Sequence, residues 1–322
     1  MTTQILFAVT PAARPSFLVY PAAFHDRRSS ESYSSIFLNS KVEITTSDGV
    51  ILRCCMFPPD ALAALQRYPQ AGPSQSMPHK KAPIATVIVF HGNGMDYGDL
   101  EPVAEGFLKL GCNVLMVSYR GYVDSEGTPS EKGLRRDAQA ALDHVSGDPE
   151  LSKIPIILYG LSLGGAVATD LASRNPSAIS ALIIENTFES LPRIVRRWPY
   201  IGVFSFLCTQ KWDSAAKLPR IPARTPILML SGGWDHVVPP MHMAALWRIS
   251  RTRGGVGPVS EKDRFESFAH GGHFGTFECP GYWEKVGEFV SAVTSTTTDG
   301  WKGIGVQDLN SQDLNVGLQG EA

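Results

Sequence analysis

Short apolar runs alternate with stretches of helical periodicity along most of the chain. The apolar runs fall at residues 85–90, 113–119, 154–159, 181–185 and 226–230. Between them, apolar residues recur at the spacing of amphipathic helices. Strands that are apolar on both faces and joined by helices are typical of a parallel sheet that is covered on both sides. The pattern therefore predicts an α/β fold with a mostly parallel central sheet and helices on both faces.

The segments outside this alternation of strands and helices set the domain boundaries. Residues 42–56 read as a β-hairpin turned by a Ser-Asp-Gly sequence, and the Pro-rich stretch 58–83 reads as an irregular surface loop. We expect one domain over residues 41–295, preceded by an N-terminal extension at 1–40. The tail, residues 296–322, is rich in Thr, Ser, Gly, Asp, Asn and Gln, a composition that predicts disorder.

An insertion at residues 187–220 interrupts the alternation of strands and helices. It is dense in large apolar side chains, Trp198 and Phe204 among them. One interpretation is a helical cap that packs on the core. The other is a lid that lines an apolar substrate pocket. The two interpretations are compatible, and we assign Trp198 and Phe204 to substrate binding.

Composition and charge narrow the classes of function. The 322 residues have a formal net charge of −2, which does not favour nucleic-acid binding. The five cysteines form no C-x-x-C pair, which argues against a disulfide framework and against a zinc site. No run reaches the roughly 18 apolar residues of a membrane-spanning helix. The N-terminus also lacks the continuous apolar run and cleavage site of a secretory signal.

Ser162 lies at the centre of a G-x-S-x-G pattern. The pattern directly follows the predicted strand at 154–159 and opens a predicted helix, which is the context of a nucleophile elbow in the α/β-hydrolase fold. Its glycines permit the tight turn that holds the serine side chain clear of the backbone. The N-terminus of the helix supplies an N–H group and a partial positive field for a developing oxyanion. We therefore predict Ser162 as the nucleophile and the backbone N–H of Leu163 as one oxyanion donor.

The acid and the histidine of this fold follow the serine in that order, each after a strand. Asp235 lies four residues beyond the predicted strand end at Ser231, and His273 follows the strand-like run 264–268. Asp235 and His273 are therefore the predicted acid and base. His270, three residues earlier, is the alternative base. The His-x-x-His spacing also fits a metal site, an interpretation that we do not favour.

The sequence H-G-N-G at residues 91–94 closes the first predicted parallel strand. In this fold the loop after that strand supplies the second oxyanion donor. We assign that role to the backbone N–H of Asn93, with Gly94 as the alternative. The glycine spacing also resembles a nucleotide-binding loop. However, a hairpin precedes it and it does not open the first βαβ unit, so the nucleotide reading is weak.

The chain resembles the α/β-hydrolase domain-containing protein 13 family, which includes the bud-emergence-type hydrolases. The matching segments are LVYPAAF (18–24), TSDGV (46–50), HGNG (91–94), SYRGYVDSEG (118–127), GLSLGGAVA (160–168), ENTF (185–188), SGGWDHVVPP (231–240) and GGHFGTF (271–277). The resemblance implies the α/β-hydrolase fold, and it places the family's serine, aspartate and histidine at Ser162, Asp235 and His273.

The chain also departs from that family in three ways. Its first loop reads HGNGMD where the family tends towards HGNAGN, and its loop at 58–83 is longer. Members of the family carry an N-terminal membrane anchor just before the LVYP-like segment, and here seventeen residues precede that segment.

The residues and the resemblance together predict a serine hydrolase that cleaves acyl or lipid-like ester or thioester bonds through an acyl-enzyme. The mechanism requires no cofactor and no metal. An acyltransferase on the same triad and a non-catalytic scaffold of hydrolase fold in polarity or trafficking stay open as alternatives. We expect a monomer that acts on a small-molecule substrate, in the cytoplasm or peripherally on a membrane, without a spanning segment or a nucleic-acid partner.

Overall fold

Eight strands form one sheet in the order β1-β2-β4-β3-β5-β6-β7-β8. The computed structural model describes residues 20, 40–62, 82–196, 205, 208–253 and 259–295. The strands are β1 (Lys41–Thr45), β2 (Ile51–Phe57), β3 (Thr86–Phe90), β4 (Asn113–Val117), β5 (Ile156–Leu161), β6 (Ala181–Glu185), β7 (Ile227–Gly232) and β8 (Arg264–Phe268). β2 pairs antiparallel with β1 and with β4, and all other neighbours are parallel. The mostly parallel sheet predicted from the sequence is confirmed.

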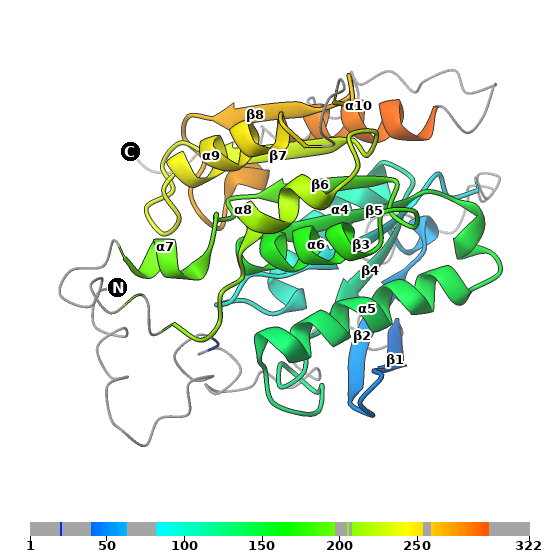
Figure 1. Cartoon of the computed structure of the whole chain (residues 1–322). Coiled ribbons are helices and arrows are strands. Elements are labelled where there is room, and N and C mark those ends of the chain that lie inside the picture. The colour runs from blue at the N-terminus through cyan, green and yellow to red at the C-terminus, as the bar shows by residue number, and fades with distance from the viewer. Residues whose placement is uncertain are drawn as a thin grey trace, which may run out of the picture.

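Helices cover both faces of this sheet (Figure 1). The α-helices are α4 (Glu101–Lys109), α5 (Glu131–Gly147), α6 (Leu163–Arg174), α7 (Leu191–Val195), α8 (Ser214–Lys217), α9 (Met241–Ser250) and α10 (Tyr282–Thr294). Short 3₁₀ turns complete the connections: η3 (Pro59–Ala61), η4 (Tyr97–Leu100), η5 (Leu151–Lys153), η7 (Leu218–Arg220) and η8 (Thr276–Glu278). In Figure 1, α5, α6 and α9 lie in front of the sheet, and α4 and α10 lie behind it.

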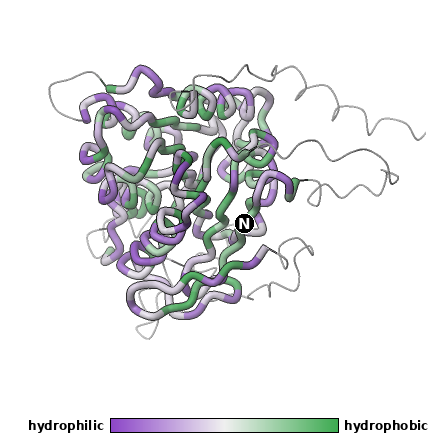
Figure 2. Tube along the Cα trace, turned by 90° about the vertical axis from the view of Figure 1, so that its right-hand side faces the viewer, coloured by the Kyte–Doolittle hydropathy of each residue, from purple (hydrophilic) through white to green (hydrophobic). Residues whose placement is uncertain are grey.

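Each face of the sheet has its own apolar core because successive side chains of a strand point to opposite faces. On β3, Ile88 packs with the core under α5 and α6, whereas Val87 and Val89 pack with the core under α4 and α10. All residues of the five central strands are buried. Figure 2 shows the hydrophobic segments in the middle of the molecule and the hydrophilic ones on its outer helices and loops.

The insertion predicted at 187–220 contains the short helices α7 and α8. Trp198 and Phe204, which the sequence analysis assigns to substrate binding, lie outside the described residues. The same holds for the predicted tail (296–322) and for the N-terminal extension except Tyr20 and Ser40. Tyr20 is fully buried in the core under α5 and α6.

Candidate active site

Three polar side chains from three loops meet at the carboxyl edge of the sheet. Ser162 directly follows β5, Asp235 lies in the loop after β7, and His273 lies in the loop after β8. His273 Nε2 lies 3.0 Å from Ser162 Oγ, and His273 Nδ1 lies 2.7 Å from Asp235 Oδ2. The structure thus brings together the three residues that the sequence analysis assigns as nucleophile, acid and base.

The backbone at Ser162 adopts a conformation that is rare for residues other than glycine, with φ 56° and ψ −116°. Such a conformation typically costs about 1–3 kcal/mol and persists only where the surrounding structure imposes it. Close backbone packing imposes it here. A Cβ atom added at Gly160 would lie 2.2 Å from the Gly164 carbonyl oxygen, and one at Gly164 would lie 2.0 Å from the Phe90 carbonyl oxygen. Packing therefore requires both glycines of the pattern.

Backbone N–H groups orient the acid, and the acid orients the base. The N–H groups of Val237 and Val238 donate to Asp235 Oδ1 at 2.9 and 2.8 Å. This leaves Asp235 Oδ2 to accept the Nδ1–H of His273. With its Nδ1 proton engaged, the imidazole presents Nε2 to the Ser162 hydroxyl as an acceptor. All three side chains are buried, with residue exposures of 3–7%.

Asp213 and Asp263, the other aspartates that lie between or near the predicted triad residues in the sequence, have other partners, and so does the alternative base. Asp213 caps the N-terminus of α8. Asp263 forms a buried ion pair with Arg253 at 2.8 Å. His270 is exposed, and its ring contacts that of Trp234. Within the described part of the chain, none of the three hydrogen-bonds to the nucleophile.

The two N–H groups assigned to the oxyanion hole come from segments that adjoin the nucleophile. Leu163 is the first residue of α6, so its N–H has no partner within the helix. Gly92 lies close to the serine, because a Cβ atom added there would be 3.5 Å from Ser162 Cβ. Asn93 follows Gly92, and its side chain accepts a hydrogen bond from the Tyr122 hydroxyl at 3.1 Å. The oxyanion roles of Asn93 and Leu163 stay predictions.

His91 begins the same loop as a buried, neutral imidazole. Burial lowers the pKa of His91 below its ordinary value. Its ring packs against those of Tyr119 and Tyr122, at centroid distances of 4.3 and 4.9 Å. Its Nδ1 donates to the Gly92 carbonyl oxygen at 2.9 Å. These contacts fix the loop that lies beside the nucleophile.

Asn186, directly after β6, links the loop of the acid to the loop of the base. The residue is buried, and its φ is 44°. Its Nδ2 donates to the carbonyl oxygens of Gly272 and His273 at 3.1 and 3.2 Å, and to Thr276 Oγ1 at 2.9 Å. Its Oδ1 accepts the N–H of Gly232 at 2.8 Å. No role for Asn186 was predicted from the sequence. The signal that identifies it is a polar side chain directly after a buried parallel strand.

Glu185, the last residue of β6, is a buried carboxyl group behind the nucleophile. Its carbonyl oxygen accepts the Ser162 N–H at 2.9 Å. Its Oε2 accepts hydrogen bonds from the hydroxyl groups of Tyr159, at 2.7 Å, and Tyr282. Burial raises the pKa of Glu185 to about 7, against the lowering effect of the two hydroxyl groups. The carboxyl group is therefore protonated in mildly acidic solution.

The raised pKa of Glu185 predicts a pH-dependent loss of stability. Between about pH 4.5 and 7 the folded chain binds more protons than the unfolded chain. The free energy of unfolding therefore falls as the pH rises through this range, and the contribution of the protonated Glu185 is lost once the pH passes about 7. A Glu185→Gln variant cannot ionise. Relative to the wild type, its free energy of unfolding should rise by about 3 kcal/mol between pH 4.5 and 8, at about 1.36 kcal/mol per pKa unit. Denaturant unfolding of both proteins at several pH values measures this difference. A difference that stays constant with pH would contradict the prediction.

Apolar side chains flank the acid and the base. The large apolar side chains that are strongly exposed in the described part of the chain are Trp234, Val237, Met241 and Phe274, at 46–59% exposure. Trp234 precedes the acid and Phe274 follows the base, and the Phe274 ring contacts the His273 ring. We call these four residues the apolar rim.

Neither a metal centre nor a membrane helix is found among the residues that the structure describes. No group of three or more His, Cys, Asp or Glu side chains there is placed to hold a metal ion. In the same ranges, none of the helices has both the length and the apolar character that a membrane crossing requires.

Comparison with known proteins gives three findings. A family model described as serine aminopeptidase, S33, matches residues 81–201. The chain is 35% identical to protein bem46 of Schizosaccharomyces pombe over 281 residues, which cover 85% of each chain. It is 36% identical to the α/β-hydrolase domain-containing protein WAV2 of Arabidopsis thaliana, over 64% of this chain and 69% of that one.

Solved structures share the fold at much lower sequence identity. An esterase of Pyrococcus furiosus superposes with a TM-score of 0.62 at 21% identity, covering 83% of this chain and 95% of that one. This likeness shows the α/β-hydrolase fold, which agrees with the fold class that the sequence predicts.

Proposed function

Because the chain belongs to the family of α/β hydrolases that includes protein bem46, we propose that it is a serine hydrolase that cleaves ester or thioester bonds. The observation that carries the proposal is the continuous chain of hydrogen bonds from Ser162 Oγ through His273 to Asp235. The test is covalent labelling with a fluorophosphonate probe. The wild type should be labelled on the peptide that contains Ser162, and a Ser162→Ala variant should stay unlabelled.

The reaction follows from the positions of these groups. Ser162 Oγ attacks the carbonyl carbon of the substrate while His273 Nε2 takes its proton, and Asp235 stabilises the resulting imidazolium. The N–H groups of Leu163 and Asn93 donate to the oxyanion of the tetrahedral intermediate. The intermediate collapses to an acyl-enzyme, and the leaving alcohol or thiol takes the proton from His273. Water then attacks the acyl-enzyme with the same proton transfers, which releases the acid and restores the serine.

The apolar rim supports substrates with an apolar acyl or alcohol group. Trp234 and Phe274 adjoin the acid and the base in sequence, so a substrate bound at the reacting serine passes near them. Covering water-exposed apolar surface with a substrate favours binding, by about 0.8 kcal/mol per buried methylene. The apolar content of the 187–220 insertion points to the same substrate class, with Trp198 and Phe204 as the proposed contacts.

The dependence of rate on acyl-chain length tests this substrate class. From p-nitrophenyl acetate to butyrate and octanoate, kcat/KM should rise by about fourfold per buried methylene, until the pocket is filled near or before palmitate. Trp198→Ala and Phe204→Ala should shift the preferred length, whereas Trp301→Ala, in the predicted tail, should not. A preference for acetate that neither substitution changes would reject the lipid-like substrate.

Asn186 should act as a positioning residue for the acid and the base. Asn186→Gly removes the side-chain hydrogen bonds but tolerates the positive φ, so it separates their loss from backbone strain. We expect kcat to fall by about 10²-fold with KM nearly unchanged, because displacements near 1 Å in a catalytic group cost that much. Asn186→Asp should be no better, since it places a second acceptor against the Gly272 and His273 carbonyl oxygens. A wild-type kcat in the glycine variant would contradict this role.

A further inference from the structure

A cationic cavity of about 240 Å³ opens between α5, the end of α6 and the β1–β2 turn. Its lining residues are Ser47, Lys132, Arg135, Arg136, Gln139 and Arg174. The four on α5 follow the i, i+3, i+4, i+7 spacing that puts side chains on one face of a helix. None of the lining residues belongs to the triad or to the apolar rim. The cavity therefore has a chemistry that the proposed hydrolysis does not use.

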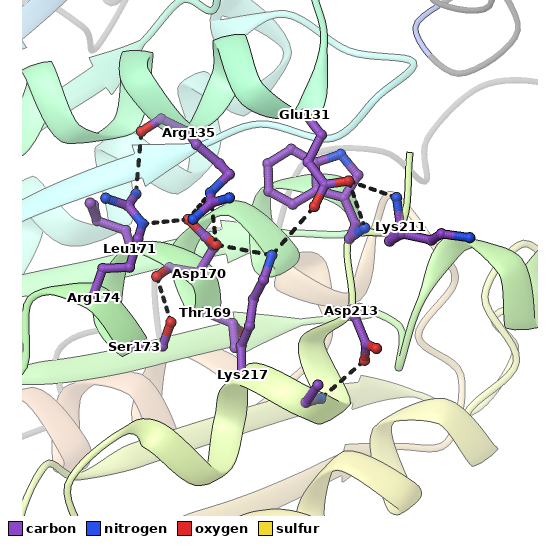
Figure 3. A network of polar contacts seen from close by, with 12 residues as sticks. Glu131, Arg135, Thr169, Asp170, Leu171, Ser173, Arg174, Lys211, Asp213 and Lys217 are labelled. Carbon is purple, nitrogen blue, oxygen red and sulfur yellow. Dashed lines mark hydrogen bonds and ion pairs between the residues drawn. The ribbon is translucent and has the colours of Figure 1, made fainter. Parts of the chain in front are cut away.

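Asp170 of α6 contacts two of the lining cations, and Figure 3 shows it among Arg135, Arg174 and Lys217. Its side chain is 2% exposed and contacts Arg135 Nε at 3.1 Å, Arg174 Nε at 2.8 Å and Lys217 Nζ at 2.9 Å. Although burial raises the pKa of Asp170, Lys217 and Arg174 together hold it below its ordinary value. One ionised carboxylate thus contacts three cations, of which Lys217 also reaches Glu131 at 3.5 Å. Arg135 uses only Nε in this contact, so both of its terminal nitrogens remain able to donate.

On the other side of the cavity, Lys132 is the cation in excess. Arg136 Nη1 lies 2.6 Å from Asp48 Oδ2, and Asp48 also binds the guanidinium of Arg120, which Asp137 contacts in turn at 2.7 Å. Lys132 is exposed and makes no ion pair among the described residues. The side chains of Arg135 and Arg136 are 42% and 37% exposed, so both are accessible to a ligand from solution.

We propose that this cavity binds the phosphate group of an anionic ligand. Together with the groups that share their carboxylates, the four lining cations form a set of six cations (Lys132, Arg135, Arg136, Arg174, Arg120 and Lys217) and four carboxylates (Asp48, Asp137, Asp170 and Glu131), which leaves a surplus of about two positive charges. A phosphomonoester carries about −1.5 to −2 charges at neutral pH and matches that surplus, whereas a carboxylate supplies one. Arginine forks bind phosphate oxygens in pairs, and lysine adds a point charge. The volume lies below that of sites for drug-sized ligands, so it suits a phosphate head group.

Two probes distinguish a soluble phosphate ester from a lipid head group. The first is inorganic phosphate, titrated into the full chain by calorimetry at low salt. The second is sedimentation with phosphatidylcholine vesicles, with and without phosphatidic acid. The test variant is Lys132→Gln/Arg136→Gln, and Lys132→Gln alone serves if the double variant does not fold. The matched control, Lys153→Gln/Lys285→Gln, removes the same charge from exposed ion pairs elsewhere.

We expect binding to weaken at least tenfold in the test variant and to stay unchanged in the control, with hydrolysis of a short soluble ester unaffected in both. If inorganic phosphate shows the difference, the ligand is a soluble phosphate ester. If only vesicles with phosphatidic acid show it, the ligand is a lipid head group. Absence of binding by the wild type in both assays, or equal weakening in the control variant, would overturn the proposal.

Discussion

If the proposed mechanism is right, ester turnover should fall by about 10⁴-fold or more when Ser162 is replaced by alanine, because among the described residues the hydroxyl group that bonds to His273 Nε2 is that of Ser162. The residual rate would come from substrate binding and from the N–H groups that face the oxyanion. The expected effect is on kcat, with a small change in KM, since the serine acts in the transition state. Steady-state kinetics on a soluble ester measure it.

A matched serine variant controls for nonspecific damage to the same helix. Ser173 lies near the other end of α6, and its hydroxyl donates to the Asp170 carbonyl oxygen. Ser173→Ala should therefore keep a rate within about twofold of the wild type, as expected for a substitution far from the reacting atoms. If Ser162→Ala retains turnover and probe labelling, the nucleophile is a different residue.

The fold and the three central site residues could be predicted because they depend on local signals. Apolar runs separated by helical periodicity determine which segments form parallel strands, and parallel strands place their C-terminal ends at one edge. Ser162, Asp235 and His273 each follow such a strand. The order of the motifs along the chain was therefore enough to predict that these three side chains meet.

The supporting contacts could not be predicted because they depend on how distant segments come together. The bonds of Asn186 exist only because β7 lies next to β6, and β8 next to β7, in one register. Glu185 ends an apolar run, and nothing in that run shows that two tyrosine hydroxyl groups from β5 and α10 enclose it. The cationic cavity likewise joins Ser47 of the β1–β2 turn to Arg174 at the end of α6.

Substituting each histidine of the H-x-x-H sequence in turn should give opposite results. His273→Ala should lose about 10⁴-fold or more in kcat, because Ser162 then has no base within hydrogen-bond reach. His270→Ala should stay within a few fold of the wild type, since that side chain is exposed and its ring contacts that of Trp234. Both variants should show wild-type thermal unfolding within a few degrees, which separates lost chemistry from lost structure. An inactive His270→Ala protein beside an active His273→Ala protein would transfer the role of base to His270. It would also mean that the loop after β8 rearranges when substrate binds, because only such a movement could carry His270 to the nucleophile.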